Sequence, residues 1–384
     1  MLGVIGTSRK RDERRVPIHP MQLETLSGDF RSELFFEEGY GLPFGVTDQR
    51  IKDLTGGVRS RAELMATSDI VLLFKPVVAD IAEMSPGTTL WGCPHFVQDE
   101  QMTSACIERR LTVLTIEGMR QWTNSDAFSL FSFHRVSEMA GFCSVQHALQ
   151  ETGQTGIYGR PLRAVVVGFG STGRGAVQAL HSQGIFDVTL VTQRAPAAVA
   201  GPPKSVSLVQ AIRGEDGSEF VRCGGAEQPI AVFLGQFDVI VNAVLQRPRQ
   251  PRVFVTTQQL SGFNRGTLIV DVSCDTGMGF EWASPTSFEA PTTAIGDGGG
   301  ITYYAVDHSP SLLWDAASWV ISEALLPFVP IVLGDEASWL GNPTIARAVE
   351  MVEGVVKNPD VLAYQGRSQD YPHVKVPDST PRGL

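Results

Sequence analysis

Residues 163–173, with the sequence RAVVVGFGSTG, decide the fold of this chain. Their first five residues are mostly β-branched and predict a buried strand. The three glycines that follow have the spacing G-x-G-x-x-G: the first permits a tight turn, the second lets the backbone approach a pyrophosphate, and the third lets helix and strand pack closely. A helix predicted over 173–183 gives the context of a dinucleotide-binding loop rather than of a packing turn alone. The predicted cofactor-binding residues of this loop are Gly168, Gly170, Ser171, Thr172 and Gly173.

The strand predicted next, over 187–192, ends in Thr192, Gln193 and Arg194. NAD-binding enzymes usually carry Asp or Glu at this point, where it binds the ribose hydroxyls. An acidic side chain would repel a 2′-phosphate, whereas arginine can pair with one. We therefore expect these three residues to contact the cofactor and NADP to be favoured, with NAD as the other candidate. The alternative is an arginine that faces solvent without a ligand.

Strands alternate with helices in two successive parts of the chain, which predicts an α/β fold with two Rossmann-like parallel sheets. The strands expected in the first part cover residues 1–7, 32–37, 69–74, 88–91 and 111–116. Those expected in the second part cover 163–167, 187–192, 237–244 and 267–272. Helices are expected over 21–26 and 99–110, a long one over about 126–151, and several from 312 to about 356. The chain end from about 358 is expected to be extended or loose.

Length, charge and cysteine content limit the classes of function. The chain has 384 residues, which suffice for two or three domains. Its formal net charge is -10 without a long basic run, which argues against nucleic acid or an anionic membrane as a partner. None of the five cysteines forms a CxxC pair, so we expect free thiols and no metal site. Without a signal-like or membrane-spanning apolar segment, the expected location is the cytoplasm.

Four polar residues stand at or just beyond the ends of apolar runs: Arg15, Lys75, His95 and Glu117. In parallel α/β sheets, ligands lie beyond the carboxyl ends of the strands. Arginine can clamp a carboxylate, lysine and histidine can transfer protons, and glutamate can receive a substrate ammonium. Taken singly, each residue also fits a role without a ligand. Arg15 could form a surface ion pair, Lys75 could be solvated at a strand end, His95 could be a loop residue, and Glu117 could be a charge at a helix start.

Several segments resemble a family of amino-acid dehydrogenases. In the first half, DERRVP (12–17) resembles alanine dehydrogenases and N5-(carboxyethyl)ornithine synthase, and FEEGYG (36–41) and SRAE (60–63) resemble the latter. In the second half, the segments that resemble fungal saccharopine dehydrogenase are GRGAV (173–177), VDVSCDT (270–276) and VDHSPSLL (306–313). The resemblance runs from about residue 1 to 330, and the order and spacing of its motifs make it more specific than the glycine loop.

The resemblance implies two α/β domains with an active-site cleft between them. The substrate domain would be discontinuous, formed by residues 1–138 and 309–384, with the Rossmann domain 139–308 inserted. Lys75 and His95 would be the catalytic pair, and Arg15 would bind a substrate carboxylate. The further residues that the resemblance places at the substrate or the cofactor are Glu13 and Glu117 for the substrate, and Val272, Asp275, Asp307 and His308 for the cofactor.

This chain departs from the family pattern at three points. Pro76 follows Lys75, where relatives commonly carry an acidic residue. Cys93 can be aligned with the family histidine in place of His95; His95 is preferred because a thiol cannot replace imidazole as a proton shuttle near neutral pH. The acidic residue after the second Rossmann strand is missing.

The resemblance implies an NAD(P)H-dependent oxidoreductase that acts on the CH–NH bond. The favoured reaction couples the amine of an amino acid to a 2-oxo acid through an imine, giving a product of the saccharopine or carboxyethyl-amino-acid type, or runs in reverse. The expected partners are these small molecules, with homo-oligomerisation left open. An alanine-dehydrogenase-like enzyme that uses ammonia is the second candidate. A catalytically silent NADP-binding sensor is a candidate of another class.

Overall fold

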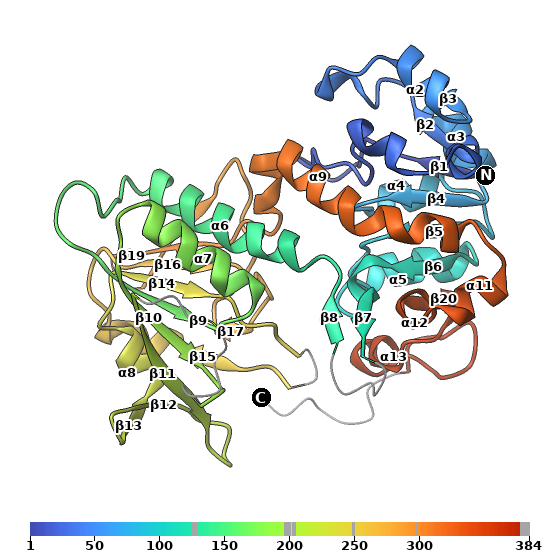
Figure 1. Cartoon of the computed structure of the whole chain (residues 1–384). Coiled ribbons are helices and arrows are strands. Elements are labelled where there is room, and N and C mark those ends of the chain that lie inside the picture. Colours follow the sequence, from blue (N-terminus) through green and yellow to red (C-terminus); the bar gives the residue numbers. More distant parts are fainter. Residues whose placement is uncertain are drawn as a thin grey trace. The chain divides into compact units, whose positions relative to one another are not determined.

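The computed structural model describes residues 1–376 apart from 124–128, 196–200, 202–204, 248–249, 297 and 299. The chain forms two compact units, of which the first comprises Met1–Phe133 and Leu313–Leu384 and the second comprises His134–Leu312. These limits lie within five residues of the domain limits given above. Both units are α/β structures with mainly parallel sheets, which confirms the expected fold class (Figure 1).

The first unit contains an eight-stranded sheet with the order β21-β20-β6-β5-β4-β1-β2-β3. Its strands are β1 (Leu2–Val4), β2 (Leu34–Glu37), β3 (Gly57–Arg59), β4 (Ile70–Leu73), β5 (Thr89–Gly92), β6 (Thr112–Thr115), β20 (Val349–Val352) and β21 (Val355–Val356). Strands β1 to β6 pair in parallel, so their carboxyl ends lie along one edge. The strand order changes direction between β1 and β4, and open α/β sheets bind ligands at such a point.

Helices and a small ribbon complete the first unit. The α-helices are α1 (Gly28–Ser32), α2 (Asp48–Leu54), α3 (Arg61–Thr67), α4 (Val78–Glu83), α5 (Glu100–Glu108), α9 (Trp314–Leu325), α10 (Val329–Val332), α11 (Glu336–Gly341), α12 (Pro343–Ala346) and α13 (Pro359–Gln365). An antiparallel ribbon consists of β7 (Arg120–Trp122) and β8 (Ser129–Phe131). Serine and threonine N-caps begin two of the helices: Thr47 accepts a hydrogen bond from Arg50 N, and Ser60 from Glu63 N.

The second unit contains a nine-stranded sheet with the order β13-β12-β11-β10-β9-β14-β16-β19-β18. Its strands are β9 (Arg163–Val167), β10 (Asp187–Thr192), β11 (Val206–Arg213), β12 (Glu219–Cys223), β13 (Ala226–Pro229), β14 (Val239–Asn242), β16 (Leu268–Asp271), β18 (Thr292–Ile295) and β19 (Ile301–Tyr304). The α-helices of this unit are α6 (His134–Glu151), α7 (Ser171–Ser182) and α8 (Ile230–Leu234). Strands β15 (Val253–Val255) and β17 (Gly279–Phe280) form a separate pair. The six strands from β11 to β19 in this order are parallel, and the order changes direction between β9 and β14.

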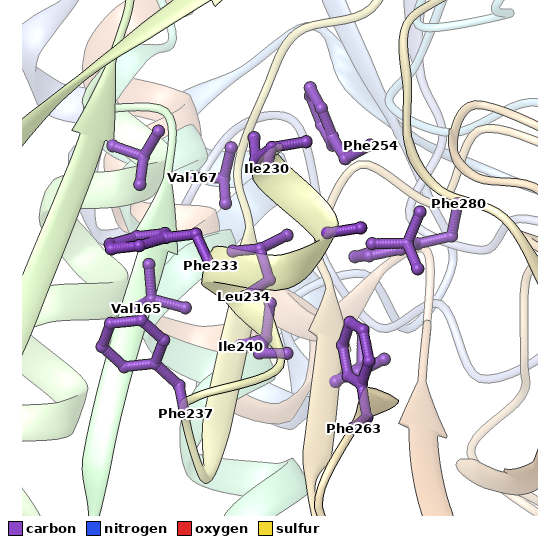
Figure 2. Packing of buried hydrophobic residues seen from close by; sticks show 14 of the residues in the cluster. Val165, Val167, Ile230, Phe233, Leu234, Phe237, Ile240, Phe254, Phe263 and Phe280 are labelled. Carbon is purple, nitrogen blue, oxygen red and sulfur yellow. The ribbon is translucent and has the colours of Figure 1, made fainter. Parts of the chain in front are cut away.

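One face of the second sheet is covered by an aromatic-rich core around α8. Figure 2 shows Phe233 and Leu234 of this helix packed beside Val165 and Ile240 of the sheet. Each fully buried side chain of this size contributes roughly 1.5–3 kcal/mol by leaving water. This packing holds β9 and β14 in place, and the loops at their carboxyl ends with them.

Three segments differ from the prediction, and a fourth is helical as predicted but of the 3₁₀ type. The long helix begins only at His134, since β8 occupies 129–131 and residues 124–128 lie outside the described chain. The segment 21–26 forms a 3₁₀ helix, Pro20–Thr25, whose Pro20 removes a backbone donor at its start. Valines at 349, 352, 355 and 356 form the β20–β21 hairpin, in which Glu353 and Gly354 both have positive φ, as a tight hairpin turn requires. The stretch after 358 begins with helix α13, capped by the Asn358 side chain.

Among the described residues, one helical stretch is long and apolar enough to cross a membrane, namely Ser309–Val332. Half of its most apolar window is buried inside the protein. Length and composition alone are therefore weak evidence for a membrane span here.

Candidate active site

Arg15 is buried and paired with Glu13 in the loop that follows β1. Its Nε lies 2.8 Å from Glu13 Oε1, its Nη2 lies 2.5 Å from Oε2, and both side chains are at most 3% exposed. The guanidinium carbon also lies 4.9 Å from the centre of the Phe74 ring, next to Lys75. Glu13 thus holds Arg15 through two N–H groups, which leaves the Nη1 edge of the guanidinium for a further acceptor.

Lys75 and His95 are brought together by neighbouring strands. Lys75 follows β4, where its carbonyl oxygen accepts a 2.5 Å hydrogen bond from the Ser8 hydroxyl. His95 follows β5 in a left-handed backbone conformation with φ of 52°. This unusual conformation turns its ring back toward β4, and the Lys75 ammonium nitrogen Nζ contacts His95 Nε2. Two residues 20 positions apart in the sequence therefore form one acid–base pair.

Glu117 lies on the other side of the imidazole ring. It is in the 3₁₀ turn Ile116–Gly118 that follows β6, and its Oε1 accepts a 2.8 Å hydrogen bond from His95 N. The same oxygen lies 3.3 Å from His95 Nδ1. With an N–H at Nδ1 facing Glu117, Nε2 is left to accept a proton from Lys75 or to face a substrate. Strands β4, β5 and β6 thus supply the sequence Lys75–His95–Glu117 from adjacent ends.

Cys93 lies beside the same ring and is buried. Its Sγ is 3.8 Å from His95 Nε2. Burial, and then the charge of Glu117, raise the pKa of the Cys93 thiol well above its usual range, so it stays a neutral thiol. Cys93, His95 and Glu117 offer three donor atoms within 4.8 Å of one another, as a metal would require. A metal would need the thiolate, however, and Lys75 already contacts the imidazole nitrogen.

The glycine loop has the backbone geometry of a phosphate-binding turn. Gly168 has φ of 95°, which favours glycine. A Cβ on Gly173 would lie 2.1 Å from Gly168 O, whereas a Cβ on Gly170 would meet nothing within 4 Å, so the space above Gly170 is open. Gly170 caps α7 without a side-chain hydrogen bond, and the N–H groups of Ser171 and Thr172 begin the helix. These residues fit a dinucleotide pyrophosphate.

Helix α7 is fixed by unusually close contact with α6. A Cβ on Gly141 would lie 1.9 Å from Thr172 O, and one on Gly175 would lie 1.8 Å from Glu138 O. The two helices therefore touch backbone to backbone, which only glycine permits. This contact sets the position of the first turn of α7 and hence of the glycine loop.

Arg194 points back at the glycine loop. It follows β10, and its Nη2 donates a 2.7 Å hydrogen bond to Phe169 O. Arg174 of α7 places its guanidinium carbon 4.3 Å from the centre of the Phe169 ring. Thr192 is buried and accepts from Arg194 N at 3.3 Å, while Gln193 is exposed. Two cationic side chains therefore lie against one residue of the loop.

The remaining predicted cofactor residues lie near the ends of β16 and β19. Val272 donates its N–H to Asn242 O at 3.0 Å, and Asp275 accepts from Met278 N through its carbonyl oxygen at 3.0 Å. The Nδ1 of His308 lies 2.5 Å from Asp307 Oδ1. These four residues lie in two loops, each of which follows a parallel strand of the second sheet.

Two domain models of one protein family match nearly the whole chain. The N-terminal domain model of alanine dehydrogenase/PNT matches residues 4–140, and the C-terminal domain model matches residues 137–359. The chain belongs to the alanine dehydrogenase/PNT family. The family resemblance seen in the sequence is thereby confirmed. The general function that it predicted, that of an NAD(P)-dependent oxidoreductase of amino acids, is confirmed at the level of the family.

Individual members of the alanine dehydrogenase/PNT family match most of the chain at low identity. An alanine dehydrogenase of Mycobacterium tuberculosis is 23% identical over 377 residues, covering 94% of this chain and 96% of its own. An N(5)-(carboxyethyl)ornithine synthase of Lactococcus lactis subsp. lactis is 24% identical and covers 82% of this chain and 90% of its own. A solved L-alanine dehydrogenase superposes with a TM-score of 0.74 at 20% identity, covering 95% of this chain and 99% of that one. The shared fold is thus shown, but not the substrate.

Several polar residues close to these sites were not predicted from the sequence. Asp271 at the end of β16 is fully buried and accepts hydrogen bonds from Asn242 Nδ2 and the Tyr303 hydroxyl, both at 2.9 Å. Gln365 and Glu350 approach the His95 region from the chain end. Asp271 stands in the segment VDVSCDT, where a charged residue at the end of an apolar strand was a usable signal. Gln365 and Glu350 carried no such signal in the sequence, because only the tertiary fold brings them close to the His95 region.

Proposed function

We propose that this protein is an NADPH-dependent enzyme that reductively couples the amine of an amino acid to a 2-oxo acid, or catalyses the reverse reaction. The contact between Lys75 and His95, backed by Glu117, is the observation that carries the proposal. An imine-forming reaction must move protons onto and off the carbinolamine oxygen and the amine, and a paired lysine and histidine can do both.

Each residue of the first unit has a defined task in this proposal. Arg15, held by Glu13, binds a substrate carboxylate through its Nη1 edge. His95 gives its Nε2 proton to the carbinolamine oxygen as water leaves, and Glu117 keeps the ring oriented through Nδ1. Lys75 then gives a proton to His95 Nε2 and takes one from the substrate ammonium as the amine attacks, which restores the pair. When bound, NADPH would supply the hydride for the imine carbon.

The cofactor is held by the second unit. The open space at Gly170 and the N–H groups of Ser171 and Thr172 receive the pyrophosphate. Arg194 can exchange its bond to Phe169 O for a 2′-phosphate, because a charged acceptor makes the stronger hydrogen bond. This supports NADP over NAD. Val272, Asp275, Asp307 and His308 complete the proposed cofactor contacts.

An alanine-dehydrogenase-like reaction with ammonia is the second candidate. It is favoured by the relatives that bear the name alanine dehydrogenase, while the Lactococcus relative favours coupling of two organic substrates. The Lys75–His95–Glu117 arrangement serves both reactions, since both pass through an imine.

One assay separates the candidates. Purified protein is given NADPH with pyruvate, 2-oxoglutarate or glyoxylate, together with ammonia or with each of a panel of amino acids, and NADPH absorbance is followed. Oxidation that requires an organic amine supports the coupling enzyme, and oxidation with ammonia alone supports the dehydrogenase. NADPH binding without oxidation in any combination would contradict both and indicate a sensor.

A further inference from the structure

The side chain of Asp271 joins the ends of three parallel strands in the second unit. It is the last residue of β16 and is fully buried. Its Oδ1 accepts a 2.9 Å hydrogen bond from Asn242 Nδ2 at the end of β14, and its Oδ2 accepts one of 2.9 Å from the Tyr303 hydroxyl on β19. One carboxyl group thus connects the neighbouring strands β14, β16 and β19.

Asn242 extends this connection to the loop that follows β14. It is fully buried, and its Oδ1 accepts a 3.3 Å hydrogen bond from Val244 N. The same loop borders the glycine loop, because a Cβ on Gly168 would lie 2.7 Å from Ala243 O and 3.2 Å from Val244 Cγ2. The Asn242 side chain therefore helps to position backbone that lies against the proposed pyrophosphate site.

The loop that follows β16 depends on the same carboxyl oxygen. Cys274 N donates a 3.3 Å hydrogen bond to Asp271 Oδ1, and Cys274 has a left-handed backbone with φ of 56°, which a residue with a side chain rarely adopts. Asp275, a proposed cofactor contact, is the next residue. The Ser273 hydroxyl donates a 2.7 Å hydrogen bond to Val244 O, which ties this loop to the first one.

We propose that Asp271 is a positioning residue for the cofactor, and that its Oδ1 fixes the two loops, residues 243–246 and 272–276, beside which the dinucleotide binds. This role rests on the proposed function, in which Val272 and Asp275 of the second loop contact the cofactor. A buried carboxyl group costs free energy unless donors surround it, and here the donors come from the loops and strand ends of the proposed cofactor site. Backbone and side chains that receive a ligand need such supporting hydrogen bonds to hold their geometry.

The two oxygens of Asp271 have different tasks, which provides a matched pair of variants. Asn242→Leu removes a donor to Oδ1 together with the acceptor of Val244 N. Tyr303→Phe removes only the donor to Oδ2 and leaves the bonds of Asn242 and Cys274 in place. Both variants leave a buried polar atom without its partner and should lower the unfolding midpoint in denaturant, so a loss of stability alone does not distinguish them.

Binding of NADPH, measured by fluorescence titration, does distinguish them. We expect Asn242→Leu and Asp271→Leu to raise the Kd of NADPH by about tenfold or more, the size of effect that one lost buried hydrogen bond has, and Tyr303→Phe to leave it within about twofold of the wild type. Asp271→Asn should bind nearly as well as the wild type, because its amide oxygen can replace Oδ1 and its NH₂ group can donate to the Tyr303 hydroxyl. Unchanged binding in Asn242→Leu, or equal weakening in Tyr303→Phe, overturns the proposal. If Asp271→Leu does not fold, Asn242→Leu and Tyr303→Phe carry the comparison.

Amide hydrogen exchange tests the same role without a cofactor. In Asn242→Leu and Asp271→Leu, exchange should become faster in both loops, where Val244 and Cys274 lose hydrogen bonds, while β9 and α7 keep their protection. Tyr303→Phe should leave the exchange of both loops unchanged. Faster exchange spread evenly over the second unit in all three variants would show that Asp271 serves the fold alone. A wild type that binds neither NADPH nor NADH would refute the proposed function, and the exchange pattern would still decide whether Asp271 orders the two loops.

Discussion

The side-chain amide of Gln365 donates a 2.6 Å hydrogen bond to the carbonyl oxygen of Phe96, which lies 269 residues earlier in the chain. Gln365 is 3% exposed and also lies 3.1 Å from the Thr103 hydroxyl. Phe96 directly follows His95, whose backbone is left-handed. Helix α13 therefore fixes the turn that presents the imidazole, which gives the end of the described chain a part in the proposed chemistry.

Gln365→Leu should disturb His95 without touching the cofactor site. A buried Phe96 carbonyl without a donor should lower the free energy of unfolding by about 1–3 kcal/mol. We expect kcat to fall while the Kd of NADPH, measured by fluorescence titration, stays the same. Gln258→Leu, at an exposed position, is the control. If stability falls but turnover and its pH profile do not change, Gln365 serves the fold alone.

His95→Gln should lower kcat by about 10²–10⁴-fold, since a placed proton-transfer group typically contributes that much. The Kd of NADPH should stay nearly unchanged, because the residues proposed for cofactor binding belong to the other unit. Lys75→Met should have a similar effect on kcat and remove one limb of the pH–rate profile.

Cys93→Ser separates the two candidates for the proton shuttle. The Cys93 thiol is neutral and buried, so we expect this variant to keep most of its turnover, which steady-state kinetics at pH 7 measures directly. Loss of turnover in Cys93→Ser together with full turnover in His95→Gln would show that the cysteine, not the histidine, is the essential group.

The parallel strands could be predicted from sequence because their apolar runs are continuous, as for 163–167 and 187–192. The same rule placed Lys75, His95 and Glu117 at strand ends, and adjacent parallel strands then had to bring them close. The hairpin at 349–356 was not predicted, because its valines follow a region of helical pattern and its turn, Glu353–Gly354, is short. The ion pair between Arg15 and Glu13 was not predicted either, since two buried charges in one loop leave no periodic pattern in the sequence.

Arg194→Asp should reverse the cofactor preference. Arg194 lies at the glycine loop, bonded to Phe169 O, where a 2′-phosphate would be its stronger partner. We expect the wild type to have the higher kcat/KM with NADPH and the variant to have the higher kcat/KM with NADH, by a factor of ten or more, since about 1.4 kcal/mol gives tenfold. Arg174→Leu tests whether the second arginine adds to this preference. Equal or better use of NADH by the wild type would contradict the assignment.

Asp271 should make the second unit less stable as the pH rises. Burial raises its pKa to about 7, against the opposing hydrogen bonds from Tyr303, Cys274 N and Asn242. In the unfolded chain the group ionises near its ordinary value of 3.8. Its contribution is therefore fully favourable below about pH 4 and is lost progressively up to about pH 7, by about 1.4 kcal/mol for each unit of pKa difference.

Denaturant unfolding of the wild type and Asp271→Asn between pH 4 and 8 measures this contribution. Other groups titrate alike in both proteins, so the difference in the free energy of unfolding isolates Asp271. We expect the wild type to lose stability relative to the variant up to about pH 7 and the difference to be constant above it. Tyr303→Phe removes a donor that lowers this pKa, so in that background the loss should extend to higher pH. A difference that is constant from pH 4 to 8 would show that Asp271 is ionised throughout.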